Sequence, residues 1–274
     1  MSARLGLLVP ALLVASGGIA QEPSPRMECD GDWWGWRRGP NAHVCEIREL
    51  TLPSAEGLAV DADQNGSISV TGENRRDLRV RARVQAWGDD EAEAERIASE
   101  VVVRSDGVLR AEGPEQRGDG GWSVSYEVLA PREIDLTLET HNGGIAVTDV
   151  RGELTFEARN GGISIDGLAG DVRGRTTNGG VEAELTGDTW EGTGLDLETT
   201  NGGVRLRIPE DYSARLETGT VNGGIDIDFP VTVQGRLGRE FSTTLGDGGP
   251  LLRAETTNGQ VRISRARGDL TRLP

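Results

Sequence analysis

Two histidines, His43 and His141, are the side chains that could serve as a catalytic base near neutral pH. His43 lies two residues before Cys45. His141 stands directly before Asn142, at a position that equivalent parts of the chain fill with Arg, Thr or Val, so we expect it to face solvent. The sequence has no Gly-x-Ser-x-Gly elbow, His-Glu-x-x-His helix or phosphate-binding loop. Histidine-based catalysis is therefore not expected.

Carboxylates are plentiful, and stacked acidic pairs on the face of a β-solenoid can bind calcium or act on sugars. The candidates are Asp166, Asp171, Glu182, Glu184, Asp188, Asp226 and Asp228. The GGxGxDx spacing of calcium-binding nonapeptide repeats is absent, and these acids do not recur in one column of the repeat described below. We expect no enzyme activity, no cofactor and no metal site. A carbohydrate-active β-helix enzyme is the catalytic alternative.

Two cysteines and a tryptophan cluster lie close together near the N-terminus. Cys29 and Cys45 enclose a short loop, and in an oxidising compartment such a pair is expected to form a disulfide. The loop contains Trp33, Trp34, Trp36, Arg37 and Arg38, although aromatic residues are scarce elsewhere. Trp and Arg anchor interfaces and stack on sugar rings, so the cluster is a candidate contact surface. Alternatively, it folds back and covers an open end of the repeat array.

The first twenty residues have the layout of a secretory signal peptide. Arg4 precedes an apolar run over residues 5–15, and small residues follow up to Ala20, where we expect cleavage. No later segment approaches the ~20 apolar residues of a membrane helix. The formal net charge of −16 becomes −17 when Arg4 is removed, which disfavours nucleic acid as a partner. We expect a secreted protein that is periplasmic, on the outer surface or extracellular.

The elements that would position these residues come from a repeat. Asn-Gly recurs at Asn65, Asn142, Asn160, Asn178, Asn201, Asn222 and Asn258. The third and fifth residues after each Asn are apolar, as in Ile163 and Ile165, whereas the residue between them is mostly polar, as in Ser164. Such period-two alternation predicts a strand with one buried face. A second apolar column lies six residues before Asn, at Leu136, Leu154, Val172, Leu195, Leu216 and Leu252, with Ala59 as a weak first member.

Matching columns favour a solenoid, in which each strand pairs with its copy in the next coil, over a stack of hairpins. We expect an all-β, right-handed β-solenoid with Asn-Gly corners and second corners near Gly152, Gly170 and Gly187. One of the two glycines after each Asn is expected to adopt positive φ. The Asn side chains could also hydrogen-bond as a ladder along the axis, or Asn could serve for its backbone alone.

The first third of the chain departs from the repeat. Residues 78–87 alternate as a long strand, residues 90–100 predict a helix capped by Asp89 or Asp90, and strands are expected near 107–111 and 122–129. The helix is expected to cap one end of the array. The expected organisation is a signal peptide (1–20), a disulfide- and Trp-containing segment (21–50), a first coil with the helix and capping strands (51–130), and regular repeats (131–274).

A signal peptide followed by HNGGI, RNGGI, TNGGV and VNGGI segments resembles a bacterial family of unknown function described as "putative adhesins" with β-strand repeats. The resemblance covers residues 50 to 274, and TNGQV departs from it in the last copy. It implies a solenoid-like fold at the cell envelope and a non-catalytic role as an adhesin or surface scaffold. A regulatory or partner-binding component of the envelope stress response is the alternative that it implies. The expected partner is an unidentified envelope protein or glycan.

Overall fold

The computed structural model describes residues 27–29, 42–53, 56–116, 118–228 and 239–266. The expected signal peptide and the cluster of Trp33, Trp34, Trp36, Arg37 and Arg38 lie outside the described residues. The expected disulfide between Cys29 and Cys45 is confirmed. Among the described residues, no helix is both long and apolar enough to cross a membrane.

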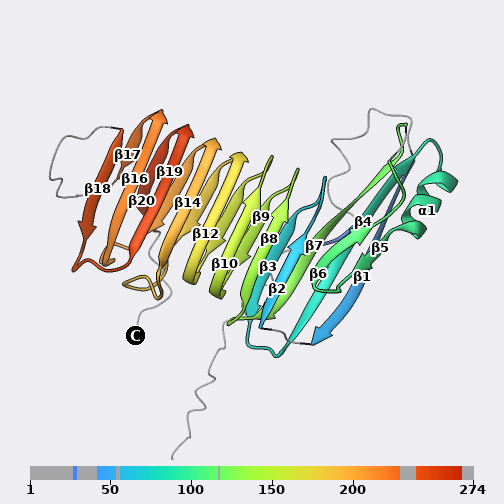
Figure 1. The fold of residues 1–274 in the computed structure, drawn as a ribbon, viewed down its shortest axis with the longest axis horizontal. Coiled ribbons are helices and arrows are strands. Elements are labelled where there is room, and N and C mark those ends of the chain that lie inside the picture. Colours follow the sequence, from blue (N-terminus) through green and yellow to red (C-terminus); the bar gives the residue numbers. More distant parts are fainter. Residues whose placement is uncertain (1–26, 30–41, 54–55, 117, 229–238, 267–274) are drawn as a thin grey trace, which may run out of the picture.

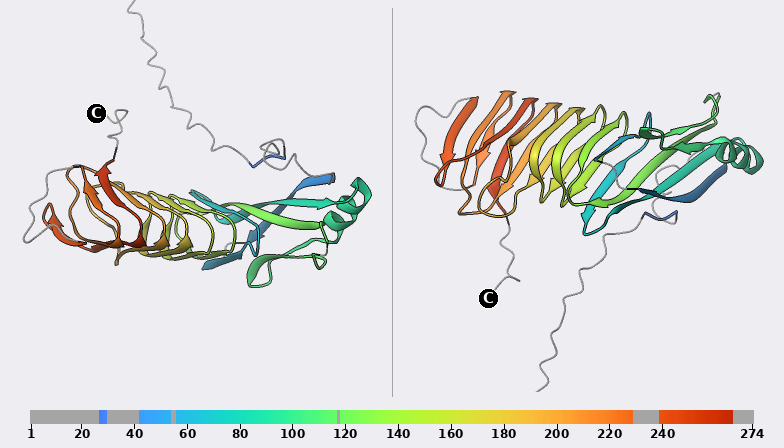
Figure 2. Two further views of the ribbon diagram at one scale, coloured as in Figure 1. Left: turned by 90° about the horizontal axis from the view of Figure 1, so that it is seen from above. Right: turned by 60° about the horizontal axis from the view of Figure 1, so that its bottom comes forward.

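Within the described residues, the strands form two ten-stranded sheets that face each other along an elongated molecule (Figures 1 and 2). Sheet A has the order β1-β4-β7-β3-β9-β11-β13-β15-β20-β17, and sheet B has the order β18-β16-β19-β14-β12-β10-β8-β2-β6-β5. The elements are β1 (Ala42–Pro53), β2 (Gly57–Asp61), β3 (Ile68–Glu73), β4 (Asp77–Gly88), α1 (Glu91–Glu100), β5 (Val102–Arg104), β6 (Val108–Glu112), β7 (Gly121–Pro131), β8 (Asp135–Thr140), β9 (Ile145–Thr148), β10 (Arg151–Ala158), β11 (Ile163–Asp166), β12 (Ala169–Asn178), β13 (Val181–Glu184), β14 (Gly194–Asn201), β15 (Val204–Ile208), β16 (Ala214–Asn222), β17 (Ile225–Ile227), β18 (Glu240–Leu245), β19 (Leu251–Asn258) and β20 (Val261–Arg265). The expectation of an all-β fold with a short helix is confirmed.

Each repeat contributes one strand to sheet B before its Asn-Gly corner and one strand to sheet A after it. Equivalent strands pair in parallel and in register, so that Ile163 of β11 lies between Ile145 of β9 and Val181 of β13. Both apolar columns point into the space between the sheets, where Ile163 and Leu154 are almost completely buried. The polar residue between two buried ones faces solvent, as Ser164 does. The strand register predicted from the sequence is confirmed.

The first repeat carries one residue more than the later ones before its corner. Leu58, which stands seven residues before Asn65, pairs with Leu136 and is buried. The assignment of Ala59 to this column was wrong, because an additional residue between β2 and Asn65 shifts the register by one.

The order of the repeats in space differs from their order in the sequence. The last strands of the chain, β19 and β20, lie between the repeat of β14 and β15 and that of β16 and β17. Strand β18 pairs antiparallel with β16 at the end of sheet B. The expected sequential stacking therefore holds from β8 to β15, after which the chain places its final repeat inside the array.

Helix α1 lies at the opposite end of the molecule, where β1, β4 and β7 extend sheet A with antiparallel pairs (Figure 1). The Asp90 side chain accepts a hydrogen bond from the backbone N–H of Glu93 at 2.8 Å and caps the helix, as expected. The Arg48 guanidinium of β1 donates to the carbonyl oxygens of Ala98, at 2.8 Å, and Val101. The first third of the chain thus forms a distinct end to the array.

Seven asparagines form a continuous side-chain ladder at the Asn-Gly corners. From Asn142 onward, each Nδ2 donates to the Oδ1 of the Asn before it at 2.8–3.1 Å, in the spatial order Asn65, Asn142, Asn160, Asn178, Asn201, Asn258 and Asn222. The side-chain ladder, one of the two explanations considered for the recurring Asn, is therefore found in the structure. The same order shows independently where the final repeat lies.

The first glycine after each of these Asn residues is required by close packing. If Gly161 carried a Cβ, that atom would lie 1.8 Å from the carbonyl oxygen of Gly143, and Gly143, Gly179, Gly202, Gly223 and Gly259 are equally confined. None of these glycines has positive φ. The prediction of positive φ at the Asn-Gly corners was wrong. At the opposite corners, Gly170 (φ 109°) and Gly187 (φ 78°) do have it, together with Asp149 (φ 57°) and Gly167 (φ 62°).

A column of buried threonines, two residues before Asn, completes the corner and was not recognised in the sequence. The hydroxyl of Thr199 donates to the carbonyl oxygen of Gly179 at 2.8 Å. Thr140, Thr176, Thr220 and Thr256 make the equivalent bond to the first glycine of a repeat beside them in space, which for Thr220 is Gly259 of the final repeat. Five of the seven corners are thereby held to a neighbouring one by an asparagine, a threonine and a closely packed glycine, whereas the Asn160 corner has Ala158 in place of the threonine.

Candidate binding surface

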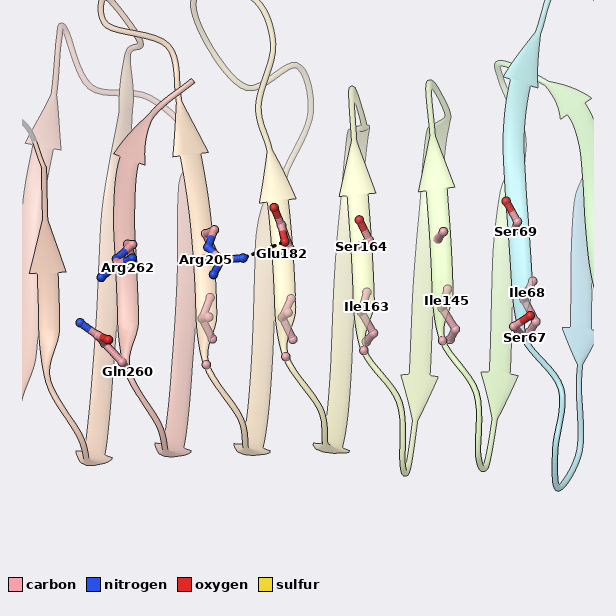
Figure 3. A pocket seen from close by; sticks show the side chains of 17 residues that line it. Ser67, Ile68, Ser69, Ile145, Ile163, Ser164, Glu182, Arg205, Gln260 and Arg262 are labelled. Atoms are coloured by element: carbon pink, nitrogen blue, oxygen red, sulfur yellow. Dashed lines mark hydrogen bonds and ion pairs between the residues drawn. The ribbon is translucent and has the colours of Figure 1, made fainter. Parts of the chain in front are cut away.

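The second position after six of the seven Asn residues lines a groove on the outer face of sheet A (Figure 3). The groove has a volume of about 690 Å³ and crosses β3, β9, β11, β13, β15 and β20. Its lining includes Gly144, Gly162, Gly180 and Gly203, one from each of four successive repeats. We call it the glycine groove.

Packing does not explain the absence of side chains along this groove. Added Cβ atoms at Gly144, Gly162, Gly180 and Gly203 would lie 3.1–3.5 Å from the nearest carbonyl oxygen, so that a neighbour would have to move by a few tenths of an ångström at most. The equivalent positions at the two ends of the groove carry Ser67 and Gln260. The fold therefore tolerates a side chain at this position, and its absence from four consecutive repeats keeps the surface hollow.

The side chains two residues after these positions form a second row along the groove. Their chemistry differs between the two halves of the groove. Ser69, Ala146 and Ser164 are small and uncharged, whereas Glu182, Arg205 and Arg262 are charged (Figure 3). The charged residues are paired across adjacent strands. Glu182 and Arg205 are 3.0 Å apart, and Arg262 lies 3.2 Å from Asp226. One half of the groove thus offers backbone and hydroxyl groups, and the other half offers charged side chains of both signs, with Arg205 and Arg262 as direct neighbours in the sheet.

A second groove, of about 480 Å³, lies on the outer face of sheet B and contains several glutamates. Glu198 of β14 and Glu255 of β19 are directly opposed partners in the sheet. Arg175 lies 3.1 Å from Glu198, and Arg253 lies 2.8 Å from Glu255. Each of the two glutamates is therefore held in an ion pair.

The acidic residues selected from the sequence are dispersed over both sheets. Within the described part of the chain, no three acidic, histidine or cysteine side chains are grouped so as to hold a metal ion. The pKa of Asp166 is raised, first by burial and then by the negative charges of Glu184 and Asp149. Asp171 pairs with Arg173 at 2.8 Å. His141 is half-buried beside the ladder, and the solvent-facing position predicted for it is confirmed in part.

The family model described as "Toastrack DUF4097" matches residues 118–264, more than half of the chain. No curated protein matches the sequence.

Three solved structures are remote likenesses. One is titled a "putative cell adhesion protein" from Clostridium sporogenes, with 13% identity over 82% of this chain and 100% of that one and a TM-score of 0.38. A "putative adhesin" from Bacteroides fragilis has 12% identity over 81% and 97% of the two chains and a TM-score of 0.35. A "putative lipid binding protein" from Parabacteroides distasonis has 8% identity over 81% and 97% and a TM-score of 0.32. Similarities at this level establish no function.

Proposed function

The chain belongs to the Toastrack DUF4097 family, and we propose that it is a non-catalytic binding scaffold of the bacterial cell envelope that holds an extended partner in the glycine groove. The observation that carries this proposal is the run of four glycines whose side-chain space is available yet empty. Because the first glycine of each corner is fixed by packing and the second is not, the second one is free to serve recognition.

The shape of the groove suits an extended chain lying across the strands. Six adjacent strands, spaced about 4.8 Å apart, give a length of about 24 Å. Small walls at Ser69, Ala146 and Ser164 admit the backbone of a glycan or peptide, and the charged half pairs with groups of either sign. We propose an envelope glycan or an envelope protein segment as the partner.

We also propose that the two sheets wind as a right-handed β-solenoid and that the protein is secreted. Parallel, in-register stacking of equivalent strands supports the winding. The disulfide between Cys29 and Cys45 supports an oxidising location, in agreement with the signal peptide expected from the sequence. A secreted acidic rod that displays one continuous groove is suited to adhesion or scaffolding.

Filling the groove tests this function. We expect the double variant Gly162→Gln and Gly180→Gln to fold normally, since Gln260 occupies the equivalent position, and to lose retention on isolated cell envelopes. Thr137→Gln on the outer face of sheet B is the matched control and should be retained like the wild type. Retention of the double variant at the wild-type level would contradict the proposal.

The alternatives are separated by pretreating the envelopes. Loss of retention after glycan digestion indicates a scaffold bound to glycan, and loss after proteolysis indicates the regulatory or partner-binding component. Catalysis remains a second candidate because Glu198 and Glu255 face each other in the groove of sheet B. Polysaccharide cleavage by the wild type, abolished in Glu198→Gln, would establish it in place of the non-catalytic role.

A further inference from the structure

The corner of the first repeat has a sequence that no other corner shares. Residues 61–66 read Asp-Ala-Asp-Gln-Asn-Gly, which matches the first six positions of a calcium-binding loop, D-x-[DN]-x-[DN]-G. The segment holds the additional residue that shifts Leu58, and Asp63 adopts φ 48° within it. The loop therefore departs from the regular corner in both composition and backbone path.

The two carboxylates of this loop have no counter-ion among the described residues. Neither Asp61 nor Asp63 forms an ion pair there, although most charged side chains on the sheet faces do. Asp61 instead accepts a hydrogen bond from the backbone N–H of Asp63 at 2.8 Å. Glu139, the partner of Asp61 in the adjacent strand, adds a further negative charge. No ion pair among the described residues compensates Asp61, Asp63 or Glu139, since Arg104 and Arg110 on the neighbouring β5 and β6 pair with Glu112.

A buried tyrosine supplies an independent observation. Tyr126 of β7 is completely buried, and its hydroxyl has no hydrogen-bond partner within the described residues. It lines a cavity of about 10 Å³ together with Asp61, Asp63, Gln64 and Asn65. Burial raises the pKa of Tyr126, and the charges of Asp61 and Asp63 raise it further. The Tyr126 hydroxyl is thus a buried group without a partner among the described residues, beside a space large enough for about one water.

We propose that this loop binds a calcium ion through the carboxylates of Asp61 and Asp63 and the amide oxygen of Asn65, with water linking the ion to the Tyr126 hydroxyl. The Asn65 oxygen accepts one hydrogen bond from Asn142, and an amide oxygen has a second lone pair available. The site lies apart from the glycine groove, and this proposal departs from the expectation, drawn from the sequence, that the chain binds no metal.

The expected calcium affinity of this loop is low because the loop lacks the bidentate glutamate of an EF-hand. In an EF-hand the twelfth position is a bidentate Glu. Here that position is Gly72, and the neighbouring Glu73 pairs with Arg75 at 3.1 Å. With two carboxylates and neutral oxygen ligands, the site belongs with extracellular modules that bind calcium with a Kd on the order of 10⁻⁴ to 10⁻³ M. That range suits a protein outside the cytoplasm.

Terbium luminescence tests the site because Trp122 lines the same cavity and can sensitise a bound lanthanide. After chelator treatment, the mature chain should give saturable Tb³⁺ emission on tryptophan excitation, and CaCl₂ should displace it. Asp63→Asn should weaken binding by at least about tenfold, as should Asp61→Asn. Asn tolerates the left-handed backbone of position 63, so far-UV circular dichroism should be unchanged. Asp247→Asn, in an exposed turn of the C-terminal half, is the control.

Tyr126→Phe leaves both carboxylates in place and removes only the hydroxyl. We expect it to fold and to bind Tb³⁺ about tenfold more weakly, as loss of an outer-sphere partner does. Absence of saturable emission from the wild type would overturn the proposal and leave an ordered water as the occupant of the cavity. Wild-type affinity in the Asp61, Asp63 or Tyr126 variants would overturn it as well.

Discussion

Two adjacent glycines at one corner should respond in opposite ways to the same substitution. At Gly161, an added Cβ would lie 1.8 Å from the carbonyl oxygen of Gly143, and this separation must open to about 3.0 Å before the atoms fit. At Gly162, the added Cβ would lie 3.2 Å from the carbonyl oxygen of Gly180 and would point into the groove. Gly161→Ala therefore separates two repeats, whereas Gly162→Ala needs a shift of a few tenths of an ångström.

The expected magnitude follows from what the separation disrupts. Overpacking of this kind costs about 1–3 kcal/mol. Opening the repeats also strains the hydrogen bond between the Asn160 and Asn142 side chains, and each such bond contributes about 1 kcal/mol. We expect Gly161→Ala to lower the free energy of unfolding by about 3 kcal/mol, which lowers Tm by roughly 6–12 °C. Gly162→Ala should stay within about 1 kcal/mol of the wild type.

Thermal unfolding of the two variants, followed by circular dichroism at one scan rate and protein concentration, measures the difference directly. Because the substitutions are chemically identical and adjacent, each serves as the control for the other. Equal Tm values for Gly161→Ala and Gly162→Ala would refute the assignment of one glycine to packing and the other to the groove.

Five further substitutions test other parts of the corner and core by thermal or denaturant unfolding. Asn178→Ala breaks the ladder on both sides and should cost about 1–2 kcal/mol, whereas an unchanged Tm would mean that the ladder contributes nothing. Thr199→Val keeps the shape and removes one buried hydrogen bond, at about 1 kcal/mol, and a stability gain would contradict its role. Ile163→Asp should cost several kcal/mol and Ser164→Asp almost nothing, so equal losses would contradict the strand register. The raised pKa of Asp166 means that its protonated form stabilises the fold below the unfolded pKa and that this stability is lost as pH rises through the folded pKa. Asp166→Asn should therefore raise the free energy of unfolding at neutral pH. A gain in stability that persists at pH 3 would contradict this cause.

The columns of the repeat could be predicted because a parallel stack imposes them directly. Ile145, Ile163 and Val181 must resemble each other since they are neighbours in one sheet and share one buried layer. The helix was predicted from a different, local signal, the capping aspartate at its start, which is Asp90 in the structure. Local chemistry and periodicity were therefore sufficient for the strands, their register and α1.

The position of the final repeat could not be predicted from these columns. Any Asn-Gly corner can stack on any other, so the pattern around Asn258 fits equally well after Asn201 or after Asn222. The connections between strands decide the order, and they carry no periodic signal. The placement of Asn258 between Asn201 and Asn222 therefore depends on tertiary structure and is seen only there.

The role of Gly161 was predicted for the wrong reason. Asn-Gly in a single hairpin calls for positive φ, but in a parallel stack the adjacent repeat approaches so closely that it excludes a Cβ at any φ. The threonine column was visible in the sequence at Thr176, Thr199 and Thr256 and could have been found by extending the columns toward the N-terminus. The glycine groove could not, because one sequence does not distinguish a glycine required by packing from one left open.

Photo-crosslinking from within the groove tests the central claim most directly. A benzoylphenylalanine placed at Ser164, which lines the glycine groove on β11 two residues after Gly162, should capture envelope material on irradiation. The same group at Thr137, on the outer face of sheet B, should capture little. Crosslinking at Ser164 that far exceeds crosslinking at Thr137 is the result that the account predicts. Equal yields at both positions, or a higher yield at Thr137, would contradict it.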